Sequence, residues 1–224
     1  MSLQQSAVPS AGHPELGAAP APTPVRPGCW VVVPAASTAT FRARDIARRT
    51  VVGTFPIVEG QVQVDGAGCP VAVSAVLDAT GIETGIARRE RDLRSRHFFD
   101  VAAFPTIAFT GAEVRPAEAG WVVEGRLLVR DVSCPVVLDV RPEPAGSAGG
   151  GGGAGGAGVA SSSIAAADTA HVADGGARID GGPVVVVATT TLDRRDAGLR
   201  AAPGFVIGHR VEVEVRATLQ PPPG

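Results

Sequence analysis

The sequence predicts an all-β protein, an antiparallel barrel or sandwich, and three observations favour this fold class. Runs of residues with a period of two follow one another along the chain, about nine or ten of them, as short strands do. The breaks between these runs are short and rich in Gly and Pro, which is typical of turns. Apart from one helical interruption, no helical pattern separates successive strands, and a βαβ fold would need helices there.

Strands in the first half of the chain are expected from residue 29 onward. In the last of them, Val71, Val73, Ala75 and Leu77 fall on one face, which indicates that this face is buried. The turn after the preceding strand is Gly66-Ala67-Gly68, a sequence suited to a tight reversal. The predicted strands here cover residues 29–34, 37–43, 48–55, 57–65 and 71–79.

Strands resume after residue 105, and the last two have the clearest pattern. Residues 184–193 are almost all β-formers, and the final run alternates Val211, Val213 and Val215 with Glu212 and Glu214. This alternation predicts a strand with one buried face and one wet face. The predicted strands in this half cover residues 106–114, 120–130, 134–141, 184–193 and 206–219.

Two segments lie outside this pattern, so we expect a single barrel domain over residues 28–220 with two additions. Residues 1–27 are rich in Pro and Ala and predict a disordered tail, because they cannot bury enough apolar surface to order themselves. Residues of about 143–180 predict a flexible Gly/Ala/Ser-rich insertion. Its glycine run, Gly149 to Gly158, is no phosphate-binding loop, since no lysine follows it.

Composition excludes several function classes. The net charge is −2, which argues against an electrostatic binder of nucleic acid. All twenty basic residues are Arg, and the chain has no Lys, Asn or Tyr. Schiff-base chemistry, a P-loop lysine and N-glycosylation are therefore excluded. Hydrophobic residues make up 45% of the chain but aromatic residues only 4%, so the core must be mainly Val and Ala.

Cysteines and histidines give no pattern for a metal or a catalytic centre. Cys29, Cys69 and Cys134 are far apart, and we expect small buried or half-buried thiols in a reducing compartment. Only His97 and His209 lie in the predicted barrel, too few for a three-histidine metal site. We expect no cofactor, no metal and a cytoplasmic location, because residues 1–27 lack a secretory signal pattern and no apolar run approaches the length of a membrane span.

Residues 80–109 are the densest part of the chain in charge and aromatic side chains. Five arginines between residues 88 and 96 indicate either a solvated helix face, paired internally with Glu90, Asp92 and Asp100, or a patch that captures a polar lipid head group. A Ser-His-Asp set of Ser95, His97 and Asp100 is the third alternative, resting only on closeness in sequence. We expect a short helical segment near residues 85–99.

Motifs across the chain also resemble a known family. Within residues 84–109 they are Thr84-Gly85, Asp92-Leu93-Arg94-Ser95, Phe98-Phe99-Asp100 and Phe104-Pro105-Thr106-Ile107-Ala108-Phe109. Further elements follow the same order: Phe41 with Arg44, Gly53-Thr54-Phe55, Gly125-Arg126-Leu127 with Pro135-Val136, and Leu192 to Leu199. Together they resemble the YceI-like family over roughly residues 29–220.

The resemblance implies an extended antiparallel lipocalin-like β-barrel of about eight strands that binds a polyisoprenoid. The chain departs from the family at several histidines: Asp45 and Asp92 stand where the family commonly has His, and Ala36-Ser37 replaces a His-Ser pair. Ala197-Gly198 replaces a late Phe-Gly pair, and the element before Phe98 begins with His97. The chain thus resembles a divergent member, and chemistry that depends on those histidines is not expected.

The predicted function is non-catalytic binding, transport or sequestration of an isoprenoid-like lipid, of the polyisoprenoid or quinone type, in an apolar lumen. Burial of a forty-carbon chain at roughly −0.3 kcal/mol per heavy atom gives about −12 kcal/mol. The expected partner is an apolar lipid, with no nucleic acid and no stable membrane insertion, and a homodimer is left open. The alternatives are a structural or interaction module with a barrel filled by its own side chains, and, third, an enzyme.

The predicted ligand-binding residues are the apolar ones of the cap and the strands that face it. Arg94 and Ser95 are the predicted polar mouth, and no catalytic or metal-binding residue is predicted. The ligand-binding set is Phe41, Phe55, Leu93, Phe98, Phe99, Phe104, Ile107, Phe109 and Leu127.

Overall fold

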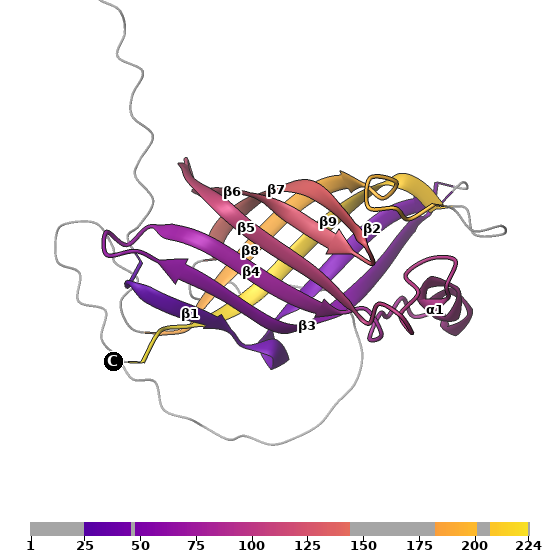
Figure 1. The fold of residues 1–224 in the computed structure, drawn as a ribbon, viewed down its shortest axis with the longest axis horizontal. Coiled ribbons are helices and arrows are strands. Elements are labelled where there is room, and N and C mark those ends of the chain that lie inside the picture. The colour runs from indigo at the N-terminus through magenta and orange to yellow at the C-terminus, as the bar shows by residue number, and fades with distance from the viewer. Residues whose placement is uncertain (1–24, 46–47, 144–181, 201–206, 224) are drawn as a thin grey trace, which may run out of the picture.

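The computed structural model describes residues 25–45, 48–143, 182–200 and 207–223, and these form a long β-barrel with one α-helix at one end (Figure 1). The predicted fold class is confirmed. The predicted N-terminal tail and the predicted insertion fall almost entirely on residues outside the described ranges.

The elements agree closely with the strands expected from the period-two runs. In chain order they are β1 (Gly28–Val32), the 3-10 helix η1 (Pro34–Ala36), β2 (Thr38–Asp45), β3 (Thr50–Val64), β4 (Pro70–Asp78), α1 (Ala87–Arg94), β5 (Thr106–Ala117), β6 (Gly120–Val129), β7 (Val132–Glu143), β8 (Val184–Asp193) and β9 (Ile207–Gln220).

Eight strands close the barrel in the order β3-β2-β9-β8-β7-β6-β5-β4, with β4 pairing back onto β3. All pairings between neighbours are antiparallel. Strand β1 pairs with the last residues of β3, Gln61–Val64, and with Leu219 and Gln220 of β9. Strand β1 therefore lies between β3 and β9 at one end of the barrel, and β2 lies between the same two strands over the rest of their length. The 3-10 helix η1 joins β1 to β2.

One predicted boundary is wrong: residues 48–55 and 57–65 are not two strands but the single strand β3. The residue between the two predicted runs is Pro56. At Pro56 the pairing of β3 with β2 ends, because Pro56 pairs with Thr38, the first residue of β2. The pairing of β3 with β4 begins at the next residue, Ile57. A proline lacks only the N–H donor, and at a change of neighbours the strand tolerates that loss.

The two ends of the barrel differ, and Figure 1 shows them on opposite sides of the view. The α1 end holds helix α1 between β4 and β5, together with the β2–β3, β6–β7 and β8–β9 connections. The β1 end holds β1 and the β3–β4 and β5–β6 turns. The described structure begins three residues before the predicted domain: Val25 is buried, and its N–H donates to the carbonyl of Gly68 at 3.1 Å.

Helix α1 confirms the short helical segment expected near residues 85–99. It is anchored by Leu93, whose side chain is 1% exposed. Because its N-cap residue, Ile86, offers no capping side chain, the loop before it is tied differently: the Thr84 N–H donates to the Glu90 carboxylate at 2.7 Å. Among the described residues, no helix is long and apolar enough to span a membrane.

Candidate functional site

The lumen of the barrel contains a cavity of about 260 Å³ that reaches from the β1 end to the α1 end. Inward-facing residues of β2 to β9 line it, as their alternation predicts. Examples are Val136, Leu138 and Val140 of β7 and Val211, Val213, Val215, Ala217 and Leu219 of β9. Nearly all the lining side chains are apolar. The arrangement can enclose an apolar molecule but offers little to polarise a reacting bond.

Eight of the nine residues predicted to contact a ligand line this cavity. Three aromatic contacts join them at the α1 end. The ring centroids lie 5.5 Å apart for Phe41 and Phe55, 5.4 Å for Phe55 and Phe99, and 5.0 Å for Phe98 and Phe99. The eight are Phe41, Phe55, Leu93, Phe98, Phe99, Ile107, Phe109 and Leu127.

Phe104 is the ninth, and the structure places it outside the cavity lining. The chain reverses at Asp100, which has a φ of 49°, and the Phe104 N–H closes this turn on the Asp100 carbonyl at 2.8 Å. The half-buried ring then lies beneath the guanidinium of Arg130, 5.7 Å from ring centroid to Cζ. Phe104 is thus a packing residue of the cap and not a lumen residue.

The predicted polar mouth, Arg94 and Ser95, also lies outside the cavity lining. The Arg94 guanidinium donates to the carbonyls of Thr80 and Ile82, at 2.8 Å from Nε and 2.5 Å from Nη2. The Ser95 hydroxyl donates to the carbonyl of Asp92 at 2.7 Å. Both side chains therefore hold the ends of helix α1 in place.

Internal pairing of the helix arginines is not what the structure shows. Glu90 accepts the Thr84 N–H, and this bond lowers the pKa of its carboxyl, with further contributions from the Gly85 N–H and Arg94. The guanidinium groups of the other four arginines of the cluster form no hydrogen bond or ion pair with any residue that the structure describes; these are Arg88, Arg89, Arg91 and Arg96. They are surface groups of the α1 end.

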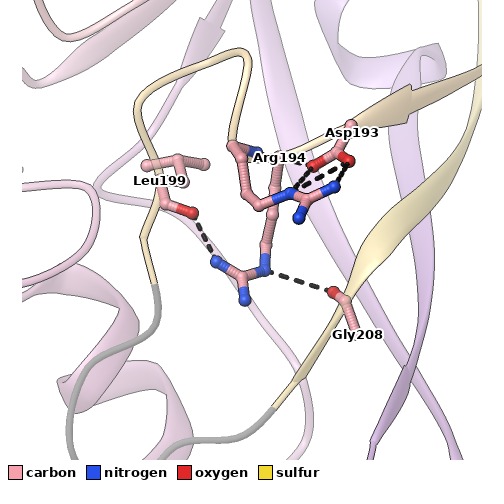
Figure 2. A network of polar contacts seen from close by, with 5 residues as sticks. Asp193, Arg194, Leu199 and Gly208 are labelled. Carbon is pink, nitrogen blue, oxygen red and sulfur yellow. Dashed lines mark hydrogen bonds and ion pairs between the residues drawn. The ribbon is translucent and has the colours of Figure 1, made fainter.

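Arg194 is a cavity residue that the sequence analysis missed. It is 7% exposed, lies in the cavity wall, and donates to the carbonyl of Gly208 at 3.2 Å and to that of Leu199 (Figure 2). Burial lowers the pKa of its guanidinium. The signal was present in the period-two pattern, because Leu192 faces inward, Asp193 outward and Arg194 inward again.

The adjacent Arg195 has the opposite surroundings. Its exposed guanidinium pairs with Asp193, with Nε 2.9 Å from Oδ1, and these hydrogen bonds lower the pKa of the Asp193 carboxyl well below its usual range. Two neighbouring arginines thus serve different purposes: Arg194 ties the two ends of the β8–β9 connection inside the barrel, and Arg195 pairs at the surface.

Both tryptophans of the chain line the other end of the cavity, and the sequence analysis missed them too. Trp30 of β1 is 1% exposed, and its indole N–H donates to the Arg26 carbonyl at 2.8 Å. Trp121 of β6 is also buried. Trp30 points into the lumen because β1 pairs with β3 and β9. The alternation of residues within β1 does not reveal those neighbours.

The barrel wall is incomplete along part of the seam between β7 and β8. The strands pair from Asp139 with Thr189 to Glu143 with Val185, but the described residues 132–138 and 190–193 are not paired with each other. An outer groove of about 410 Å³ lies along this unpaired part. It shares the wall residues Val136, Thr190 and Leu192 with the lumen cavity.

The described residues offer no assembled catalytic or metal centre. No three of their His, Cys, Asp and Glu side chains are grouped to hold a metal ion. His97 and His209 are exposed and do not line the cavity. The Ser95 hydroxyl donates to the Asp92 carbonyl and accepts only the backbone N–H of His97, so it makes no contact with the imidazole. Burial raises the pKa of the Cys134 thiol, so it is no activated nucleophile.

The remaining thiols differ in their exposure. Cys29 is half-buried, whereas Cys69 is exposed, contrary to the expectation of buried or half-buried thiols. The reason is its place in the β3–β4 turn, where its N–H donates to the Asp65 carboxylate at 2.9 Å. All three cysteines are free.

Comparison with known proteins gives both a family and a fold. The model of the YceI-like domain matches residues 30–219. A UPF0312 protein of Yersinia enterocolitica is 32% identical over 101 residues, which cover 44% of this chain and 52% of that protein. The chain therefore spans about half the length of the curated relatives it matches.

Among solved structures, Burkholderia cenocepacia BcnA is similar with a TM-score of 0.61 at 13% identity, covering 84% of this chain and 98% of that chain. A structure described as a polyisoprenoid binding domain from Saccharophagus degradans has a TM-score of 0.54 at 15% identity, covering 86% and 98%. At these identities the likeness concerns the fold. With a family model matched from β1 to β9 and an eight-stranded barrel of the same kind, the chain belongs to the YceI-like family.

Proposed function

We propose that this barrel binds an isoprenoid-like lipid in its lumen and carries or sequesters it without catalysing a reaction on it. The observation that carries the proposal is the cavity wall, which is apolar from Trp30 at one end to Phe99 at the other. Burial of apolar surface is favourable and needs no directed contacts, so such a wall suits a flexible hydrocarbon chain. The polyisoprenoid binding domain of Saccharophagus degradans supports the same ligand class.

The size of the cavity sets the length of chain that fits without rearrangement. Sites for drug-sized molecules typically measure about 300–1,000 Å³, and this cavity, at about 260 Å³, lies just below that range. A ligand of about twenty heavy atoms would gain roughly 6 kcal/mol at about 0.3 kcal/mol per atom, a dissociation constant on the order of tens of micromolar. A forty-carbon chain would have to push lining side chains apart or extend out of the barrel.

A non-catalytic role is part of the proposal. Among the described residues, the polar side chains in the cavity wall are few, and the one charged group, Arg194, is engaged with backbone carbonyls. A cytoplasmic location is also proposed, because three free thiols, with Cys69 exposed, suit a reducing compartment.

Native mass spectrometry of the purified protein, followed by organic extraction, tests the proposal. A bound species with the mass of an isoprenoid lipid, released by extraction, is the expected result. A barrel that is empty after every gentle preparation, and that stays empty when incubated with farnesol, geranylgeraniol or solanesol, would refute it.

A second candidate is a structural or interaction module whose barrel is filled by its own side chains. The small cavity volume is the observation that favours it. The same incubations separate the two candidates, since a filled barrel takes up none of the three alcohols.

A further inference from the structure

Part of the seam between β7 and β8 is unpaired, as is a stretch between β4 and β5, where residues 70–72 of β4 do not pair with β5. Along the register that pairs Asp139 with Thr189, the next positions would place Val137 opposite Thr191 and Pro135 opposite Asp193, yet neither pair forms. Unpaired strand edges are uncommon in closed barrels, because closure is what removes them. The seam therefore needs a physical cause.

Pro135 supplies that cause. Strands β6 and β7 are joined by the two-residue turn Arg130-Asp131, so Val129 and Val132 are the hydrogen-bonded pair that flanks the turn. Hydrogen-bonded and non-bonded pairs then alternate, and Pro135, opposite Arg126, falls on a non-bonded pair. Its backbone nitrogen thus faces β8, where a proline has no N–H to donate. If β7 and β8 paired at this position, they would form one hydrogen bond fewer than a strand pair without proline.

At the seam the outer groove lies next to the lumen cavity. Val136 on one strand and Thr190 and Leu192 on the other line both, so these side chains stand between the groove and the cavity. Val136 is buried, and the other two are half-buried. They are small or medium-sized side chains that can move apart without unfolding a paired strand.

Both ends of the barrel present larger obstacles. At the α1 end, Leu93 of helix α1 is buried together with Phe98 and Phe99, which follow the helix. Arg94 holds the helix against the preceding loop through the carbonyls of Thr80 and Ile82. At the β1 end, Trp30 is buried and its indole holds the preceding segment through the Arg26 carbonyl. Passage through either end would displace a fully packed aromatic or aliphatic side chain.

We propose that an apolar chain enters and leaves the lumen sideways, between residues 135–138 of β7 and 190–193 of β8. This inference rests on the proposed function, because it concerns the route to the same cavity. The chain passes between Val136 and Leu192, and its polar end group stays in the outer groove.

The charges of the groove then select the end group. Asp139, Asp193 and Asp196 line it. Arg195 pairs with Asp193 and also lies near Asp196, whereas Asp139 has no ion pair with any residue that the structure describes. A phosphate or diphosphate group would face uncompensated carboxylates, whereas an alcohol or a quinone carbonyl would not. The ligand class that fits is an uncharged isoprenoid, an alcohol or a quinone, rather than an isoprenyl diphosphate.

A disulfide across the seam tests the route. The double variant V137C/T191C, in a background carrying C29S, C69S and C134A, places thiols on two exposed, opposite positions. Uptake of geranylgeraniol is followed by the fluorescence of Trp30 and Trp121 in a stopped-flow instrument. We expect oxidation to slow uptake about tenfold and reduction to restore it, with the equilibrium affinity unchanged. An equal rate in the oxidised and reduced forms would overturn the route.

The matched control is A108C/L128C, which bridges paired, outward-facing positions on the β5–β6 seam and should leave the rate unchanged. If the seam disulfide does not form, P135V decides the question: it restores a donor facing β8 and should slow uptake several-fold, and an unaltered rate refutes the route. Absence of binding at equilibrium in every form would instead refute the proposed function.

Geranylgeranyl diphosphate tests the end group. It should bind the wild-type protein at least about tenfold more weakly than geranylgeraniol, a difference of about 1.4 kcal/mol. The variant D139N/D196N should narrow that difference. Equal or tighter binding of the diphosphate to the wild type would refute the selection of an uncharged end group.

Discussion

The rings of Phe55 and Phe99 meet edge to face, with centroids 5.4 Å apart and planes at 85°. Phe55 belongs to β3 and Phe99 follows helix α1, so this contact joins the wall of the barrel to the segment that covers its α1 end. Phe98 and Phe41 extend the contact on either side. The α1 end is therefore closed by packing that a ligand would share.

Replacing Phe99 with Ala should lower the free energy of unfolding by about 3–5 kcal/mol, because it removes a buried ring and leaves a cavity. Urea unfolding measures the change. Phe104→Ala is the control, since that ring is half-buried, lies outside the lumen and should cost less. Equal losses in the two variants would show that Phe99 is not the anchor of the cap.

Arg94→Met should lower the free energy of unfolding by about 1–2 kcal/mol, because the carbonyls of Thr80 and Ile82 each lose a charged donor. Its affinity for geranylgeraniol should match that of the wild type, since Arg94 does not line the cavity. Arg91→Met, on the exposed side of the helix, should change stability by less than about 0.5 kcal/mol. A weakened affinity with unchanged stability would return Arg94 to the role of a polar mouth.

The adjacent pair Arg194 and Arg195 should respond very differently to the same substitution. Arg194→Met leaves the carbonyls of Leu199 and Gly208 without this donor and should cost about 1–3 kcal/mol. Arg195→Met removes an exposed ion pair and should cost less than about 1 kcal/mol. Thermal unfolding of the two variants measures the difference, and a larger loss for Arg195 would contradict the burial of Arg194.

Stability should fall in mild acid through two carboxylates whose pKa values are lowered in the folded protein, Glu90 by the Thr84 N–H and Asp193 by Arg195. A carboxylate whose pKa is lower in the folded than in the unfolded protein stabilises the fold fully at pH values above its ordinary pKa, which is 4.5 for Glu90 and 3.8 for Asp193. That stabilisation is lost as the pH falls from the ordinary pKa towards the lowered one. The Tm should therefore decline below about pH 4.5. Glu90→Gln should reduce this decline, and an unchanged pH profile would contradict the assignment.

Alternation along the chain predicted most of the fold because each strand has one dry face and one wet face. Residues 184–193 became β8 with the predicted bounds, and Val211, Val213 and Val215 face the lumen from β9 as expected. The family resemblance located the cap, and its Leu93, Phe98 and Phe99 do line the cavity. These features depend on local sequence.

The features that were missed depend on which strands become neighbours. Residues 48–55 and 57–65 were predicted as two strands, because nothing local shows that β2 and β4 meet β3 at the residue between them. Arg194 was passed over because arginine is seldom buried, and its carbonyl partners come from the far side of a turn. The open seam at Pro135 became visible only once β8 was known to be the neighbour of β7.

The central claim is that the lumen takes up an apolar chain, and the two tryptophans of the protein, both in the cavity wall, report on it directly. The decisive measurement is a fluorescence titration of the wild-type protein with geranylgeraniol. The proposal predicts a saturable change at one ligand per chain, with a dissociation constant on the order of tens of micromolar. Tryptophan emission that stays constant up to the solubility limit of the alcohol would contradict it.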